Sequence, residues 1–494
     1  MTQANTHAGN TSSGRSKLEA LGAYIRYGST ILRREGLRYF LIRCWRFITG
    51  ELANLNQVIL LKLHMVPRVK LISIEDIEYQ PPSQANLELE IPSIPPKLQP
   101  AQPSSDIISD MHDDLVLRGI LSHNQQLIER NTLLQQGNKR YSGRSVLFLA
   151  PIGVLSGGAN LIIQAARAMQ RMGVFVQIFN LNIHRHWFER NFKDLDIPVI
   201  FADVDDVPAY GMDMDSVIAT SNPTVSWIDP LMLKRPNLPI GYYIQDYEPY
   251  FYPQGSHEFK RAVASYSLVP GMVRMATTAW ISDLIRQYHQ LDCKVVGVHM
   301  DIDMFRPRPR ASSFRLKPPL QILGMIRPST PRRNPKMTIS ILKQISEAFG
   351  DRVEITLFGC KPTEPGFASL VQNLPCQLAG QLRSTQMARL LNQADIFVDF
   401  SDFQALGLTA LESMACGVAV IVPARGGTDS YAIHEENCLV VDTQDKTACY
   451  QALQRLVEDD PLRSNIQANA ISTASRFFPE RTAFNMLNAV FSEN

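Results

Sequence analysis

The feature that most constrains the fold is the alternation, from Ser145 onward, of short apolar runs with longer amphipathic stretches. SVLFLAPIG is typical of a buried strand, and the following GGANLIIQAARAMQRMG of a helix that stops at Gly173. VFVQIFN is the next strand of the series. Strands that alternate with helices of ten or more residues predict a parallel α/β sheet.

The cycle of strands and helices occurs twice. DSVIATS, PIGYYIQD and TAWIS continue the first series, and LQILGMI, VEITLFG, ADIFVDFS, VAVIVP and CLVVD form the second. A chain of 494 residues is also too long for one hydrophobic core. We therefore predict an α/β protein with two Rossmann-like domains, 141–305 and 306–494. A Pro-rich hinge near 305–319 joins them, and the last helix could pack back on the first domain.

The N-terminal third has a different pattern. Residues 1–16 are predicted to be a disordered tail, and 17–140 a helical extension with a Pro-rich linker at 80–105. The stretch 17–65 has helical spacing, many arginines and a tryptophan, so it could lie on an anionic membrane surface or dock on the folded body. Both interpretations stay open. A further helix is expected over roughly 108–136, ending at Gly137.

Composition excludes several classes of protein. The formal charge of +2 gives no reason to expect a nucleic-acid partner. The sequence contains no run of eighteen apolar residues, which is the length that a helix needs to span a bilayer. The polar N-terminal stretch lacks the apolar core of a signal peptide. The seven cysteines are odd in number and form no CxxC pair, which indicates a reducing compartment and no zinc site. We expect a cytoplasmic protein, or one peripheral to the inner face of the membrane.

The segment DFSDFQALGLTALESMACGVAVIVPARGGTDSY, at 399–431, carries the strongest functional signal. It predicts a strand end, a loop and a helix that opens at Gly407, Leu408 and Thr409. Helix amides that face the carboxyl edge of a parallel sheet form a site for a diphosphate. One turn into that helix, Glu412 could accept hydrogen bonds from a ribose, or could be a solvated helix residue.

A basic loop, GMIRPSTPRRNPKM, follows a predicted strand. Arg327, Arg332, Arg333 and Lys336 lie within ten residues there, and three prolines stiffen the chain. Because arginine binds phosphate oxygens in a bidentate manner, these side chains are candidates to neutralise a diphosphate without metal. The alternative is a solvated basic loop.

Two segments of the first domain are candidates for binding an acceptor or a phosphate. Gly157 and Gly158 follow the first strand and would let the backbone approach a ligand at a helix start. The second segment is GYYIQDYEPYFYPQGSHEF, whose aromatic rings and carboxylates suit the binding of sugars. Its candidate residues are Gln245, Asp246, Tyr247 and Glu248. These aromatic residues could instead only pack a domain interface.

Segment 399–431 resembles the EGFGLxxLEAMACGxPV signature of the retaining GT-B glycosyltransferases of family 4, also called glycosyl transferases group 1. The resemblance covers roughly 145–490 and implies two Rossmann-like domains that face each other across a cleft, with a nucleotide-sugar donor bound by the second. It implies hexosyl transfer with retention, in which the donor diphosphate serves as the base. On this resemblance Arg327, Gln404, Glu412 and Asp246 are the candidate catalytic residues.

The chain departs from the family pattern at two positions. The family has two glutamates seven residues apart, and the first of them is replaced here by Gln404. Many members have a His-Asp pair where this chain has Gln245 and Asp246. The segments GYYIQDYEPYFYPQGSHEF and RPSTPRRN look closest to those of bacterial rhamnosyltransferases. This resemblance implies rhamnose as a candidate donor sugar, a glycan or lipid-linked acceptor, and a place in polysaccharide biosynthesis of the cell envelope.

Two other functions stay open. The departures at Gln404 and Gln245 are consistent with a catalytically degenerate binding subunit of a polysaccharide assembly complex. A nucleotide-sugar epimerase on the same fold would need an acid/base pair that the sequence does not supply. Three Asp-x-Asp triplets resemble metal-binding motifs of GT-A transferases, but we interpret them as chance, and expect neither metal nor cofactor.

Overall fold

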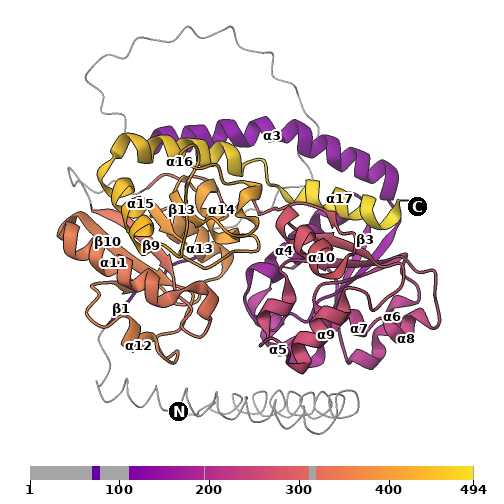
Figure 1. The fold of residues 1–494 in the computed structure, drawn as a ribbon. Helices are drawn as coiled ribbons and strands as arrows, with labels where there is room; N and C mark the ends of the chain where they lie inside the picture. Colours follow the sequence, from indigo (N-terminus) through magenta and orange to yellow (C-terminus); the bar gives the residue numbers. More distant parts are fainter. Residues whose placement is uncertain (1–68, 78–110, 194, 311–318, 493–494) are drawn as a thin grey trace, which may run out of the picture. The chain divides into compact units, whose positions relative to one another are not determined.

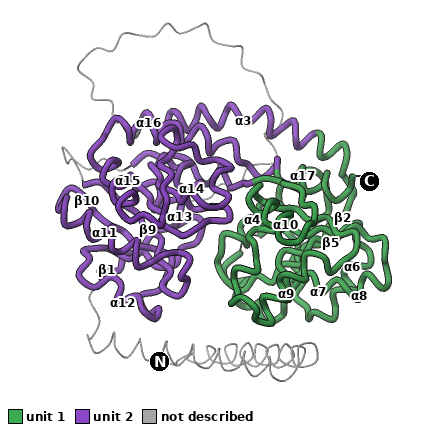
Figure 2. The backbone as a smooth tube through the Cα atoms, in the orientation of Figure 1, with its two compact units in different colours: residues 1–59, 136–297, 482–494 green, residues 60–135, 298–481 purple. Residues whose placement is uncertain are grey.

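The computed structural model describes residues 69–77, 111–193, 195–310 and 319–492, which form two compact units (Figure 2). Of these residues, unit 1 contains 136–297 and 482–492, and unit 2 contains 69–77, 111–135 and 298–481. The predicted tail, the basic helical stretch and the Pro-rich linker lie outside the described residues, as does most of the predicted hinge.

Unit 1 is built on a seven-stranded parallel sheet in the order β4-β3-β2-β5-β6-β7-β8. Its inner strands are apolar and buried on both faces, as parallel strands covered by helices require. The strands are β2 (Ser145–Leu149), β3 (Phe175–Leu181), β4 (Val199–Ala202), β5 (Ser216–Ala219), β6 (Ile240–Ile244), β7 (Val273–Ala276) and β8 (Lys294–Val295). The helices are α4 (Gly157–Arg171), α5 (Arg185–Asn191), α6 (Val207–Gly211), α7 (Asn222–Ser226), α8 (Asp229–Met232), α9 (His257–Ser265) and α10 (Ala279–His289).

Unit 2 has its own seven-stranded parallel sheet, in the order β1-β11-β10-β9-β12-β13-β14. Figure 1 labels its strands β1, β9, β10 and β13. Its strands are β1 (Lys70–Leu71), β9 (Leu320–Met325), β10 (Val353–Phe358), β11 (Gln377–Leu378), β12 (Ile396–Val398), β13 (Ala419–Pro423) and β14 (Leu439–Val441). Its helices are α11 (Pro335–Phe349), α12 (Phe367–Leu370), α13 (Ser384–Leu391), α14 (Leu408–Ala415), α15 (Lys446–Glu458) and α16 (Asp460–Ala474). The prediction of two α/β Rossmann-like units is confirmed.

The structure corrects the predicted end of the N-terminal helix. α3 runs over Met111–Tyr141 and passes through Gly137 without a break. A Cβ on Gly137 would lie 2.5 Å from the Met172 side chain, so the glycine permits close packing inside unit 1 and does not end the helix. The long α3 and the last helix, α17 (Pro479–Phe491), both pass from unit 2 into unit 1.

The interpretation of TAWIS as part of the strand series is also wrong. The strand of that region is the less apolar β7, and Ala279 already begins α10, whose N-cap Thr278 accepts a hydrogen bond from the Ile281 amide. The N-cap hydroxyl sets the helix start more strongly than the apolar run favours a strand. The short strands β4, β8 and β11 lay outside the runs that the sequence singled out.

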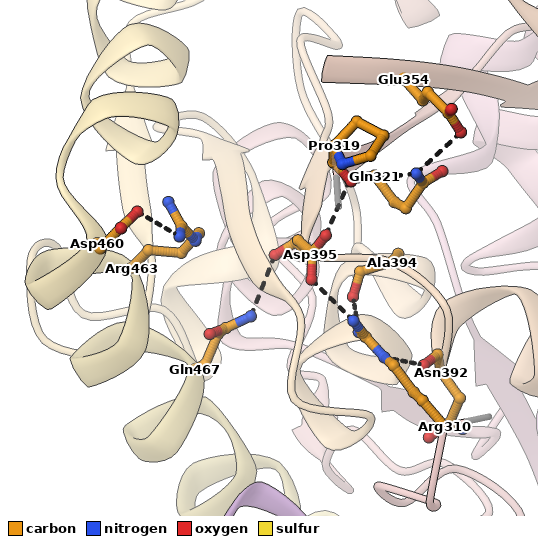
Figure 3. Close-up of polar contacts among 10 residues, drawn as sticks. All are labelled: Arg310, Pro319, Gln321, Glu354, Asn392, Ala394, Asp395, Asp460, Arg463 and Gln467. Atoms are coloured by element: carbon orange, nitrogen blue, oxygen red, sulfur yellow. Dashed lines mark hydrogen bonds and ion pairs between the residues drawn. The ribbon is translucent and has the colours of Figure 1, made fainter. Parts of the chain in front are cut away.

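A half-buried acidic residue connects the amino ends of two central strands of unit 2 (Figure 3). Asp395 precedes β12, and its carboxylate accepts hydrogen bonds from the Gln321 amide at 2.8 Å and from Arg310 Nη1 at 2.9 Å. Arg310 also donates to the Asn392 carbonyl at 2.7 Å. The β9 and β12 strands are therefore fixed in register at the edge opposite to their carboxyl ends.

Arg130 of α3 holds the N-terminal helix to the rest of unit 2. Its guanidinium is 6% exposed and donates in a bidentate manner to Asp303, at 3.0 and 2.9 Å, and to Glu480 at 2.9 Å. The Glu480 side chain is fully buried. Because a buried carboxylate is costly without a partner, this cluster stabilises α3 only as long as all three members are present.

No helix in the described part of the chain is long and apolar enough to cross a membrane.

Replacing Arg130 with alanine should lower the free energy of unfolding by about 3–5 kcal/mol, since it removes a buried cation from between the Asp303 and Glu480 carboxylates. Urea denaturation followed by circular dichroism measures this change. The control is Arg286→Ala, which removes an exposed pair with Asp283 and should cost less than about 1 kcal/mol. Equal, small effects of both changes would contradict the role given to Arg130.

Candidate functional site

The candidate site of unit 2 lies at the carboxyl edge of its sheet, where β9 and β12 are neighbours. Gly324 of β9 is in register with Val398 of β12, so the segments that follow them leave the sheet side by side. Arg327 lies two residues after β9, and Asp399 directly follows β12. The parallel pairing thus brings together the two segments with the strongest sequence signals, as it does at ligand sites of open α/β sheets.

The basic loop after β9 carries all four predicted cations. Arg327 and Lys336 are exposed, and Arg332 and Arg333 are partly exposed. A short 3-10 turn, η5 (Pro331–Arg333), leads through Asn334, with φ of +48°, into α11. Prolines at both the turn and the helix start hold this backbone in a fixed path.

Two contacts join the basic loop to the segment after β12. The Asp402 amide donates to the Arg332 carbonyl at 2.9 Å, and the Arg332 guanidinium lies over the Phe403 ring, 5.2 Å from its centroid. The two segments that the sequence proposed for one diphosphate site are therefore in direct contact. Phe403 was not a predicted site residue, although its position beside Gln404 was a usable signal.

Helix α14 begins where the sequence predicts, with Gly407 at its N-cap and Leu408 and Thr409 in its first turn. Gly407 has φ of +72°, and an added Cβ would lie 2.4 Å from the Tyr431 hydroxyl. That hydroxyl donates to the Gly407 carbonyl at 2.9 Å. Glycine is required here on both counts, and the contact fixes the path of the chain into α14.

Glu412 lies within α14 and is 6% exposed. Burial, together with the nearby charge of Asp301, raises the pKa of Glu412 to about 8. Within the described ranges its carboxyl group receives no hydrogen bond from another residue. Its surroundings suit a residue that accepts hydrogen bonds from a bound ligand rather than a solvated helix residue.

Gln404 is 4% exposed, and its side chain faces an acidic partner that the sequence analysis did not single out. Gln404 Nε2 donates to Asp399 Oδ2 at 2.5 Å and to Ser401 Oγ at 3.2 Å. The other Asp399 oxygen, Oδ1, accepts from the Ser401 amide and hydroxyl. An acidic residue directly after a buried strand was the available signal for Asp399.

The glycine-rich segment of unit 1 starts a helix, as predicted. Ser156 caps α4, its hydroxyl accepting from the Ala159 amide at 3.2 Å, and Gly157 is the first helical residue. A Cβ on Gly158 would lie 2.5 Å from Gln245 Oε1. The glycine therefore makes room for the Gln245 side chain, and the structure brings these two predicted residues together.

Of the residues that follow β6, Tyr247 and Glu248 are buried supports of the loop and Asp246 caps it. Glu248 is buried and accepts three hydrogen bonds, from the Asn222 amide and side chain at 2.6 Å each and from the Tyr242 hydroxyl at 2.7 Å. Burial raises the pKa of Glu248 to about 7. Tyr247 is also buried, with its hydroxyl 2.9 Å from His289 Nε2. Both thus support the loop from within, and Asp246 caps it by accepting from the Tyr247 amide at 2.9 Å.

The Asp-x-Asp triplets are engaged in folding contacts. In the Asp301/Asp303 triplet, Asp303 accepts hydrogen bonds from Arg130. In the Asp213/Asp215 triplet, Asp215 accepts a hydrogen bond from the Ser145 amide at 2.8 Å. Across the part of the chain that the structure describes, no three His, Cys, Asp or Glu side chains are grouped so as to hold a metal ion.

Residues 312–473 match the family profile described as Glycosyl transferases group 1. The matched range includes the basic loop, Gln404 and Glu412, and it supports the resemblance seen in the sequence. The O-antigen biosynthesis protein RfbC of Myxococcus xanthus is 26% identical over 240 residues, which is 48% of this chain and 18% of that protein. A D-inositol 3-phosphate glycosyltransferase of Stackebrandtia nassauensis is 33% identical over 104 residues, 21% of this chain and 24% of that protein. The chain thus spans less than a quarter of these two curated relatives.

Solved structures of similar fold cover more of the chain. HepE of Anabaena, in complex with UDP-glucose, has a TM-score of 0.59 at 17% identity, covering 71% of this chain and all of that one. Sucrose-phosphate synthase of Thermosynechococcus elongatus has a TM-score of 0.57 at 17% identity and covers 69% of this chain and 97% of that one. The predicted GT-B fold class, with a helical N-terminal portion, is confirmed by these likenesses.

The raised pKa of Glu412 predicts how its replacement changes stability with pH. The folded protein holds this proton more tightly than the unfolded chain, whose glutamates have a pKa near ~4.3. The stabilisation by the bound proton is therefore complete at low pH and is lost as pH rises through about 8. Glu412→Gln has no proton to lose, so its unfolding temperature should gain on that of wild type between about pH 5 and about 8.5.

Differential scanning fluorimetry across that range checks the prediction. The matched control is Glu347→Gln, which makes the same change of side chain at an exposed position of α11. A Glu412→Gln curve that runs parallel to wild type throughout would show that the Glu412 carboxyl is already ionised at low pH.

Proposed function

We propose that the chain is a glycosyltransferase that binds a nucleoside-diphosphate sugar at the carboxyl edge of the unit 2 sheet and transfers the sugar to an acceptor hydroxyl. The single observation that carries this proposal is Glu412, a buried carboxyl group without a hydrogen-bond donor in the described ranges, on a helix that starts beside a basic loop. A ribose hydroxyl would supply the missing donor, and the cations would meet the diphosphate.

The proposed division of labour follows the geometry. The first amides of α14, including those of Leu408 and Thr409, carry the partial positive charge of a helix start and would bind phosphate oxygens. Arg327 is exposed at the carboxyl end of β9 and would stabilise the charge that develops on the departing diphosphate. Arg332, Arg333 and Lys336 would raise the local concentration of the anionic donor.

The finer steps of the reaction are part of the proposal. Transfer with retention would proceed by attack of the acceptor on the face that the diphosphate leaves, with a diphosphate oxygen taking the hydroxyl proton. No protein base is then required, which is consistent with Gln245 at the position where the family often has histidine. Gln245 and Asp246 remain the candidates for binding an acceptor hydroxyl in unit 1.

The proposed substrates are a hexose donor, with rhamnose the first to test, and a glycan or lipid-linked acceptor of the bacterial envelope. The support is the similarity over 48% of the chain to a protein named for O-antigen biosynthesis, together with the segments that resemble rhamnosyltransferases. We propose that the protein works in the cytoplasm or at the inner face of the membrane, with 17–65 as the segment that would contact lipid.

A catalytically degenerate binding subunit is the second candidate, and Gln404 is the observation that favours it. A screen of nucleoside-diphosphate sugars, with detection of released nucleoside diphosphate, separates the two. Release that depends on the added acceptor supports the enzyme. Donor binding by calorimetry without release from any donor and acceptor pair would establish the binding subunit instead.

Arg327→Ala should lower kcat/KM by about two to three orders of magnitude, the loss expected for one charge-stabilising donor. Steady-state kinetics with the accepted donor measures it. Arg352→Ala is the matched control, because Arg352 lies at the amino end of β10, on the opposite edge of the same sheet, and should change kcat/KM less than about twofold. A decrease below about threefold for Arg327→Ala would remove this residue from the site.

Chelation should leave transfer intact if cations of the basic loop neutralise the diphosphate. The measurement is the rate of nucleoside diphosphate release in EDTA, compared with the rate in added magnesium or manganese. Complete loss of transfer in EDTA that manganese restores would contradict metal independence and return attention to the Asp-x-Asp triplets.

A further inference from the structure

The Gln404 amide has only one chemically sensible orientation in this structure. Its two close neighbours, Asp399 Oδ2 and Ser401 Oγ, lie 2.5 and 3.2 Å from the same terminal atom. A carboxylate oxygen accepts and cannot donate, so the amide must present its NH₂ group there. The carbonyl oxygen, Oε1, is then the atom left to accept a hydrogen bond, and within the described ranges no other residue donates one to it.

The backbone around Gln404 leaves the side chain little freedom. The Gln404 backbone amide donates to the Arg425 carbonyl, and the Gln404 backbone carbonyl accepts from the Gly427 amide at 2.8 Å. A Cβ on Gly426 would lie 1.9 Å from the Gln404 carbonyl oxygen, so only glycine permits this pairing. The orientation of the side-chain amide is thus set by its partners on a backbone that is itself fixed.

A glutamate at position 404 could not occupy the same place as a carboxylate. Its terminal oxygen would replace Nε2 about 2.5 Å from Asp399 Oδ2, and two carboxylates at that distance share a proton or repel each other. Because the Asp399 carboxylate accepts a hydrogen bond, the residue at position 404 must donate one, which glutamine does and an ionised glutamate does not. The two positions are therefore a matched pair, with the negative charge on Asp399 and a neutral acceptor in front of it.

On the basis of the proposed function, we propose that Asp399 is a positioning residue, which fixes the Gln404 amide so that Oε1 accepts a hydrogen bond from a hydroxyl of the donor sugar. The substitution of glutamine for the family's glutamate is then an adaptation, and the site binds its sugar without placing a second full negative charge beside the diphosphate. Sugar placement depends on the pair, and nucleotide binding depends on Glu412 and α14.

The proposal predicts that reversing the pair restores function. In Asp399→Asn, the NH₂ group of the introduced asparagine donates a hydrogen bond toward Gln404. The side-chain amide of Gln404 must rotate to accept this bond, and it then presents its own NH₂ group to the sugar. In Gln404→Glu, two carboxylates are in contact. In the double variant Asp399→Asn with Gln404→Glu, the introduced asparagine donates to one oxygen of the introduced glutamate, and the other glutamate oxygen is again an acceptor for the sugar.

The kinetic test uses the full chain and the donor identified by the screen. Each single variant should lower kcat at least about tenfold, and the double variant should return to within about threefold of wild type. The Kd of the free nucleoside diphosphate should stay within about threefold of wild type in all three. A purely structural role for Asp399 predicts that the losses of the two single variants add in the double variant. If the wild type is active, that result would overturn the positioning role of Asp399 and leave the proposed function intact.

The thermal test examines the pair without using activity. In Gln404→Glu the shared proton is held more tightly when folded, so its unfolding temperature should fall below wild type increasingly as pH rises from about 5 to about 8. Tyr431 also interacts with Asp399, but burial holds the pKa of its phenol well above its usual range, so it stays neutral there. The double variant should abolish this pH-dependent difference, and its persistence would overturn the pairing. A wild type that is inert with every donor would instead overturn the proposed function, and the positioning role with it.

Discussion

The parallel pairing of β9 with β12 is the constraint on which the candidate site depends. Because these strands are buried neighbours in register, the loops at their carboxyl ends must share one edge of the sheet. Asp395 fixes the opposite ends of the same strands through Arg310 and the Gln321 amide. The basic loop and the start of α14 are held together by the sheet, and the contacts of Arg332 with Asp402 and Phe403 complete the connection.

Much of this arrangement could be predicted from the sequence because it follows from periodicity and from backbone chemistry. Apolar runs located the central strands of both sheets, and Gly407 marked the start of α14. Where two signals competed, the prediction was wrong: Gly137 looked like a helix end but makes room for Met172, and TAWIS looked like a strand but begins with the helix cap Thr278. Edge strands as short as β8 carry too little pattern to be recognised.

The site shows the same division between local and tertiary information. The positions of Arg327 and Glu412 at the sheet edge could be read from the strand and helix that precede or contain them. The partner of Gln404 could not, since nothing local says that the Asp399 carboxylate faces the amide. The internal hydrogen bonds of Glu248 were hidden for the same reason, because its donors come from the segments at 222 and 242.

The central claim is that the carboxyl edge of the unit 2 sheet binds the nucleotide-sugar donor. Hydrogen–deuterium exchange with and without a saturating nucleoside-diphosphate sugar tests it most directly, since bound phosphates and ribose protect the amides that they contact. The predicted result is new protection at 326–336 and 404–412, with no change over the buried cluster around Arg130. Protection confined to other segments, under conditions where calorimetry shows the donor bound, would contradict the claim.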